Sequence, residues 1–150
     1  MGNQLVKSIA SNNMGYIYLF NLNGPAKAEE HLRQALQFNP HNRMAHANLA
    51  ELFKRRKDYA QALEHFQAAL KLDPKYINGH NELAMLYLTM AREALDAGHA
   101  EAGEELAEKA HEAHQQALGL VQEGQAEHRA EVARRFAQAA QEAGIGEKRF

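Results

Sequence analysis

Nine histidines and no cysteine make imidazole the side chain of this sequence that most suggests metal chemistry. His111 and His114 are three residues apart, so on a helix they share one face, as two ligands of a metal would. No third ligand has an evident spacing, and the sequence has no HExxH motif, phosphate-binding glycine loop or nucleophile elbow. We therefore predict no metal, no cofactor and no catalytic residue, and we expect that the chain is not an enzyme.

Two other histidines belong to a repeat in the sequence, because His46 recurs as His80 after 34 residues. The same spacing relates apolar and turn residues elsewhere: His31 and His65, Ala35 and Ala69, Leu36 and Leu70, Pro40 and Pro74, Leu49 and Leu83, Ala50 and Ala84, and Phe53 and Tyr87. A period of this length is typical of a solenoid of helix-turn-helix units, since one unit cannot bury its apolar face alone. His46 and His80 are therefore expected to pack inside the repeat, and binding becomes the expected function.

Residues 43–76 resemble the tetratricopeptide repeat, whose pattern is W-x2-L-G-x2-Y, then A-x3-F, then A and P. The residues that carry the resemblance are His46, Leu49, Ala50, Phe53, Ala62, Phe66, Ala69 and Pro74. It implies an all-α fold, a right-handed α-solenoid of three such units with an extended third unit and a capping helix. It also implies that the concave face binds protein.

The repeats are predicted at about residues 8–42, 43–76 and 77–121, within a single domain that spans residues 1–150. A further helix is predicted at about 125–143, because small apolar residues recur there at helical spacing opposite a charged face. A solenoid needs a terminal unit with a polar outer face, so this helix is expected to cap the third repeat. The tail from Gly144 onward is expected to be frayed.

The third repeat departs from the family pattern. Its closing residues Ala110, His114 and Ala117 come 14 residues later than a standard repeat would place them. That length corresponds to about two extra turns in each helix, at 3.6 residues per turn. We expect a protruding helical hairpin with its tip near Gly98, in which part of the apolar surface stays available for contacts; the residues are Met90, Ala94 and Leu95.

The resemblance implies that the first helix of each repeat lines a peptide-binding groove. The predicted groove residues are Asn12, Asn13, Tyr16, Phe20, Asn48, Glu51, Arg55, Asn81, Glu82 and Met85. Asn13 and Asn48 occupy equivalent positions and are expected to be exposed, and an amide both donates and accepts, as an extended peptide backbone requires. The alternative for each asparagine alone is that it only tolerates an exposed helix face.

Two functions follow, both of them protein binding. The first is an adaptor or chaperone that holds an extended segment of a client in the groove. The alternative is an assembly scaffold, or a self-associating protein, that uses the extended hairpin of the third repeat. Changing the groove asparagines should impair only the first, and shortening the hairpin should impair only the second.

Charge and composition limit the classes of partner that we expect. Residues 1–76 carry ten Lys or Arg against six Asp or Glu, and residues 77–150 carry seven against thirteen, a polarity that orients a partner at long range. No aromatic platform or second basic tract accompanies Lys54–Lys57, so nucleic acid is not the expected partner. The sequence has no membrane-spanning apolar run and no signal-peptide layout, and suggests no small-molecule substrate. We expect a cytoplasmic location.

Overall fold

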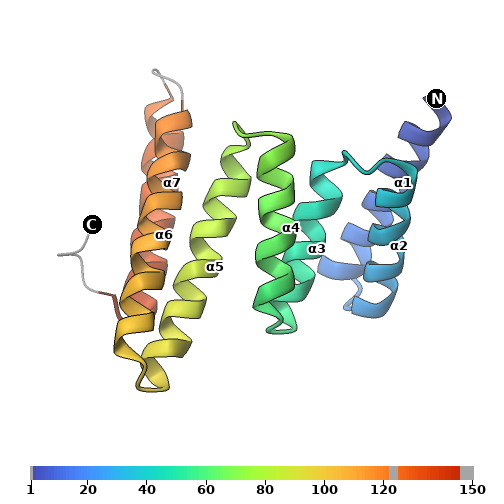
Figure 1. Cartoon of the computed structure of the whole chain (residues 1–150). Helices are drawn as coiled ribbons and strands as arrows, with labels where there is room; N and C mark the ends of the chain where they lie inside the picture. The colour runs from blue at the N-terminus through green and yellow to red at the C-terminus, as the bar shows by residue number, and fades with distance from the viewer. Residues whose placement is uncertain (1, 122–124, 146–150) are drawn as a thin grey trace. The chain divides into compact units, whose positions relative to one another are not determined.

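The computed structural model describes residues 2–121 and 125–145, which form seven α-helices and contain no strand (Figure 1). The helices are α1 (Gly2–Phe20), α2 (Pro25–Phe38), α3 (Arg43–Arg55), α4 (Tyr59–Leu72), α5 (Ile77–Asp96), α6 (Ala100–Leu120) and α7 (Ala126–Glu142). The predicted all-helical fold is confirmed for this part of the chain. The chain divides into two compact units, Met1–Pro74 and Lys75–Phe150, and its organisation as a single domain stays a prediction.

Local chemistry sets where the helices of the first unit begin. The side chain of Asn42 accepts a hydrogen bond from the backbone N–H of Ala45 (3.1 Å), and Asp58 accepts one from Gln61 (3.3 Å). Both side chains thereby satisfy an N–H group that a helix start leaves without a partner. α2 starts at Pro25, where the missing N–H costs nothing.

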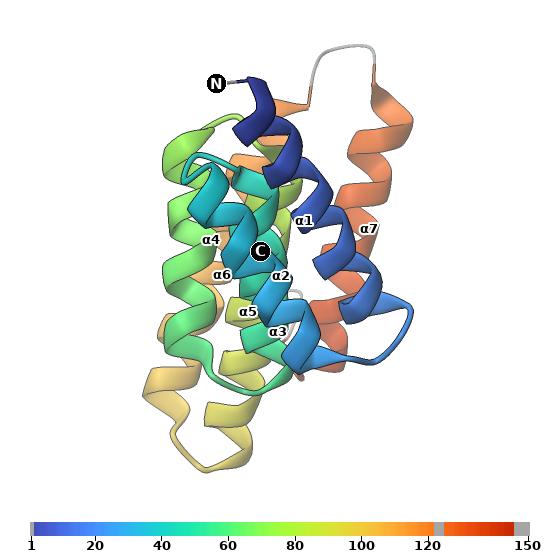
Figure 2. The ribbon, with the colours of Figure 1, turned by 90° about the vertical axis from the view of Figure 1, so that its right-hand side faces the viewer.

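The first unit consists of two antiparallel hairpins, α1–α2 and α3–α4. Figure 2 brings α1 and α2 toward the viewer and shows how closely they run together. They approach at Gly15, where an added Cβ would lie 2.5 Å from Cγ of Leu32. The core of the unit consists of residues that are almost fully buried: Leu19, Ala28, Leu32, Ala35, Ala45, Leu49, Ala50, Leu52, Phe53, Ala62, Phe66 and Ala69.

One helix-ending motif closes α3 and α5 with different residues. After α3, Lys57 adopts a left-handed backbone (φ 61°), and the N–H of Asp58 bonds to the carbonyl of Phe53 (2.9 Å). After α5, Gly98 takes the same conformation (φ 82°), and the N–H of His99 bonds to Ala94 (2.8 Å). Glycine adopts this conformation without the steric cost that a Cβ brings, so Lys57 is the strained version of the motif.

The second unit contains the long hairpin that the sequence predicts. α5 and α6 have 20 and 21 residues, against 13 and 14 for α3 and α4, so about two extra turns in each arm are confirmed. Near the tip, Leu95 packs where a Cβ on Gly103 would lie, 2.7 Å from its Cγ. Met90, Ala94 and Leu95 are therefore half-buried within the hairpin, and only part of their apolar surface meets solvent.

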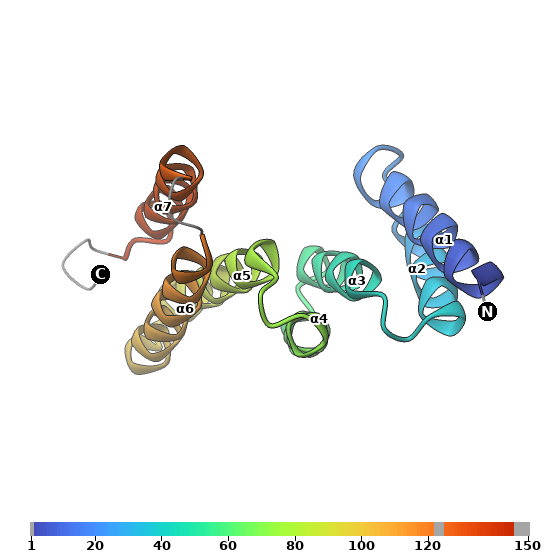
Figure 3. The same cartoon turned by 90° about the horizontal axis from the view of Figure 1, so that it is seen from above.

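α7 packs against the α5–α6 hairpin, as Figure 3 shows from above. Ala117 and Leu118 of α6 form a buried cluster with Val132 of α7. The helix ends in a glycine motif, in which the N–H of Ile145 bonds to the carbonyl of Ala140 (2.9 Å). Ile145 is 5% exposed, so the prediction of a frayed tail is wrong at this residue; residues 146–150 lie outside the described part of the chain.

Across the ranges that the structure describes, none of the helices combines enough length with enough apolar character to cross a bilayer.

Candidate interaction surface

α1 exposes apolar side chains along nearly its whole length. Six large hydrophobic residues, each between 41% and 64% exposed, fall within an arc of about 120° on the helix. These residues define the α1 stripe: Leu5, Val6, Ile9, Tyr16, Ile17 and Phe20. A contiguous apolar surface of this kind is typical of a protein interaction site, whereas single exposed hydrophobic residues are ordinary.

Four of the predicted groove residues meet at the C-terminal end of the α1 stripe. The rings of Tyr16 and Phe20 lie 4.5 Å apart between centroids. The guanidinium of Arg55, from α3, lies 4.6 Å from the centre of the Phe20 ring and donates to the carbonyl of Leu19 (3.1 Å). Arg55 also pairs with Glu51 (3.1 Å), one turn earlier on α3. The structure therefore brings these four predicted residues together, and their role in binding stays a prediction.

The asparagines behave differently from the prediction. The side-chain N–H of Asn48 donates to the side-chain oxygen of Asn12 (2.9 Å), and the two residues are only 7% and 8% exposed. The expected exposure of Asn48 is therefore wrong, because it lies between α1 and α3 and bonds to a neighbouring repeat. Asn13 is exposed, on the same face as the α1 stripe.

The other predicted groove residues belong to α5, in the second unit. Asn81 is 3% exposed and Met85 is half-buried. The carboxylate of Glu82 lies 3.8 Å from the guanidinium of Arg135 on α7. This weak ion pair links the first helix of the third repeat to the last helix. A groove that continues over all three repeats stays a prediction.

A buried hydroxyl that the sequence did not single out holds α1 in place. Ser8 is fully buried, donates to the carbonyl of Ala35 in α2 (2.8 Å) and accepts from the side-chain N–H of Asn42 (2.9 Å). Asn42 in turn caps α3, so one chain of hydrogen bonds links three helices. The sequence analysis singled out neither Ser8 nor Asn42.

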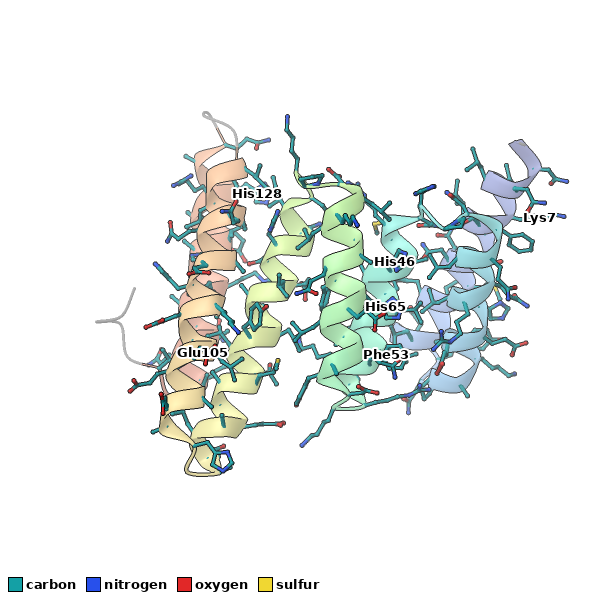
Figure 4. The ribbon with its side chains drawn as sticks, in the orientation of Figure 1. Lys7, His46, Phe53, His65, Glu105 and His128 are labelled. Carbon is teal, nitrogen blue, oxygen red and sulfur yellow. The ribbon has the colours of Figure 1, made fainter. Side chains whose placement is uncertain are left out.

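His46 is half-buried and packs against the second helix of its own repeat, in line with the prediction of a packing role. Its Nδ1 lies 3.1 Å from Nδ1 of His65, its Nε2 lies 3.3 Å from the carbonyl of Pro40, and the ring of His65 stacks on Phe53 (Figure 4). Burial lowers the pKa of both histidines, and the neighbouring His46 lowers the pKa of His65 further. Two neutral imidazoles can share one hydrogen bond, which explains their place in a packing position.

Comparison with known proteins supports this description. The family model for the tetratricopeptide repeat matches residues 17–77, which run from the end of α1 to the start of α5. This segment carries tetratricopeptide repeats, and the resemblance seen in the sequence is confirmed. Such repeats generally mediate protein–protein interaction.

One solved structure, "Crystal structure of MamA", is similar in fold. The two chains are 17% identical, the match covers 91% of this chain and 78% of that chain, and the TM-score is 0.54. At this level of identity the similarity shows the helical fold alone. No curated protein matches this chain in sequence.

Proposed function

We propose that this protein is an interaction module that binds an extended segment of a partner protein along the α1 stripe. The observation that supports the proposal is the stripe itself: of the large hydrophobic residues more than a third exposed in the described ranges, most belong to α1. Burying them against a partner contributes roughly 25 cal/mol for each Å² removed from water.

The dimensions and polar groups of the surface suit a short extended segment. From Leu5 to Phe20 the stripe is about 22 Å long at 1.5 Å per residue, which matches six or seven residues of extended chain at about 3.3 Å each. Asn13 lies between the aliphatic and the aromatic parts of the stripe, and its exposed amide can pair with the partner backbone. Arg55 and Glu51 supply charge beside the aromatic end.

The proposal can be tested with heptapeptides selected from a random library against the full chain. We expect that the double change Ile9→Ser and Phe20→Ser weakens the binding of a selected peptide at least tenfold, about 1.4 kcal/mol. Met14 is the matched control, because it is 41% exposed on the same helix but lies away from the stripe. Met14→Ser should change the Kd less than twofold, and equal losses in the two variants would contradict the proposal.

A single change isolates the polar contact. Asn13→Ala removes an exposed amide. It should weaken the binding of the selected peptide by about 0.5–1.5 kcal/mol, the usual contribution of one hydrogen bond. Fluorescence polarisation measures this loss. An unchanged Kd would mean that the apolar contacts alone account for the binding of the peptide.

The second candidate function is an assembly scaffold that uses the α5–α6 hairpin, and the extra length of both arms favours it. Removing residues 91–97 and 100–106 takes about two turns from each arm, and it removes Leu95 together with Gly103, the residue it packs on. If the hairpin is the contact surface, the shortened protein should lose self-association in analytical ultracentrifugation. If self-association is the same in both proteins, this second candidate fails.

A further inference from the structure

The exposed apolar residues of α1 are arranged symmetrically about Asn13. Val6 and Phe20 lie seven residues to either side of it. Ile9 and Ile17 lie four residues to either side. At about 100° per residue, all four side chains point within about 40° of the direction of Asn13. An antiparallel copy of the same helix would therefore bring Val6 beside Phe20 and would place the two Asn13 side chains at the centre.

The spacing of these residues is also that of a helix–helix interface. Steps of three and four residues alternate along the face, which consists of Val6, Ile9, Asn13, Tyr16 and Phe20. This is the pattern of the buried seam in coiled coils, where a single asparagine fixes the register and the number of helices. The exposed amide of Asn13 can donate to, and accept from, the same amide of a second copy. The pattern favours a helix as the occupant of this surface.

The charges of α1 allow two copies to meet. The helix contains neither aspartate nor glutamate, and its one charged side chain is Lys7. Lys7 lies about 120° around the helix from Asn13, and its Nζ is 5.7 Å from the centre of the Phe38 ring. At the aromatic end of the α1 stripe, Arg55 is paired with Glu51 (3.1 Å). Two α1 helices can therefore approach through the stripe without the repulsion of like charges.

The area of the α1 stripe is close to what a specific dimer needs. Its six large side chains belong to residues that are between 41% and 64% exposed. For residues of roughly 150–250 Å², the range of aromatic side chains, this leaves about 100 Å² each and about 600 Å² on one copy. Two copies would bury about 1,200 Å², the lower limit of specific interfaces. A dimer of this size is weak enough for another partner to displace one copy.

We infer that a second copy of this chain covers the α1 stripe when no partner is bound, with the two α1 helices antiparallel about a two-fold axis at Asn13. The antiparallel arrangement places opposite ends of the two helix dipoles side by side. A partner segment and the second copy use the same surface, so the partner binds only after the copies separate. This competition rests on the proposed function, whereas the dimer itself does not.

Opposite charges at residue 13 test the two-fold axis. Because Asn13 is exposed, Asn13→Asp and Asn13→Lys should both fold as the parent does, which circular dichroism checks. In analytical ultracentrifugation, the parent should show an equilibrium between monomer and dimer at about 1–100 µM. Each variant alone should dimerise at least about tenfold more weakly, because two like charges meet at the axis. An equal mixture of the two variants should form the dimer again.

Met14 provides the matched control, because it is exposed on the same helix but lies away from the stripe. Met14→Asp should dimerise as the parent does. A monomeric parent would overturn the inference, and so would a mixture of the two residue-13 variants that stays monomeric. Self-association that is unchanged in Asn13→Asp would also overturn it, because the contact would then lie elsewhere on the chain.

Single cysteines test the direction of the two helices, since the chain has no cysteine of its own. Under mild oxidation, a mixture of Val6→Cys and Phe20→Cys should form a disulfide between copies. Val6→Cys alone should stay reduced, because the two residues 6 lie at opposite ends of an antiparallel pair. Efficient cross-linking of Val6→Cys with itself would contradict the antiparallel arrangement.

A heptapeptide selected against the full chain separates this inference from the proposed function. A saturating amount of the peptide should convert the dimer into a peptide-bound monomer, which ultracentrifugation detects. A dimer that keeps its size while the peptide binds would overturn the competition and leave the proposed function intact. A chain that dimerises but yields no binding peptide would contradict the proposed function, and with it the competition, while the dimer would stand.

Discussion

The first and last helices of this chain place their apolar residues in opposite ways. α1 leaves seven large hydrophobic side chains in contact with solvent, whereas α7 buries Val132, Phe136 and Ala140 against the α5–α6 hairpin. The difference follows from residue size: the exposed apolar positions of α7 are alanines, and most of those of α1 are larger aliphatic or aromatic residues. α7 therefore packs its apolar side chains within its own unit, whereas α1 carries the exposed surface to which we assign a partner.

The largest expected effect comes from one phenylalanine in each helix. Phe136→Ala should lower the free energy of unfolding by about 3–5 kcal/mol, because the residue is 3% exposed and its loss leaves a cavity beside His114. Phe20→Ala should lower it by less than about 1 kcal/mol, since Phe20 is 41% exposed. Urea unfolding of the two variants measures both changes. Similar losses would mean that α1 is as much a part of the core as α7.

Acid should weaken the packing of α7 through His114. Its pKa is about 4 in the folded chain, below the usual value near 6.5, so the unfolded chain binds the extra proton first. The part of the unfolding free energy that depends on a neutral His114 is complete above pH 6.5. It is lost as the pH falls toward 4, and the loss is at most about 3 kcal/mol. Thermal unfolding between pH 7 and pH 4 measures this loss of stability. The loss should be smaller in the variant His114→Phe, because phenylalanine does not titrate. A parallel dependence in both proteins would assign the acid sensitivity to other groups.

Two asparagines are expected to have different roles. Asn48 lies between α1 and α3 and should be structural, whereas the exposed Asn13 should bind a partner. Asn48→Ala leaves the buried oxygen of Asn12 without its donor and should cost about 1–3 kcal/mol of stability. Asn13→Ala should change stability by no more than about 0.5 kcal/mol, because its side chain is exposed. Chemical denaturation gives both values. If Asn48→Ala has no effect on stability, the hydrogen bond between repeats makes no net contribution.

A small gain in stability is expected away from both terminal helices, at the turn that closes α3. Lys57→Gly places glycine at a left-handed position that closes α3, as Gly98 already closes α5. It should raise the free energy of unfolding by about 0.5–1 kcal/mol. A melting temperature that falls would show that the lysine side chain stabilises the turn by more than its backbone costs.

The sequence predicted what depends on local pattern. A period of 34 residues predicted the helical hairpins, the late Ala110 and Ala117 predicted the extra turns, and small residues at helical spacing predicted α7. The contacts between repeats could not be predicted in this way. Asn12 rather than Asn13 meets Asn48 because the offset between α1 and α3 depends on how side chains of both helices pack.

The candidate sites also differ in how far the local sequence pattern predicts them. The resemblance to a known family placed Tyr16 and Phe20 of α1 on one predicted surface with Glu51 and Arg55 of α3, and the structure brings these side chains together. The half-open cavity that residues of α6 and α7 line was not predicted, because it depends on how the two helices pack. The sequence placed His114 among the closing residues of the third repeat but did not indicate that its Nδ1 would find no hydrogen-bond partner among the described residues.

Mapping a bound peptide onto the chain is the most direct test of the proposed function. A heptapeptide selected against the full chain is titrated into ¹⁵N-labelled protein, and the amide shifts are followed residue by residue. The proposal predicts that the largest changes fall in residues 5–20 of α1 and at Glu51 and Arg55 of α3. Changes confined to α5, α6 and α7 would contradict it and place the binding surface in the second unit.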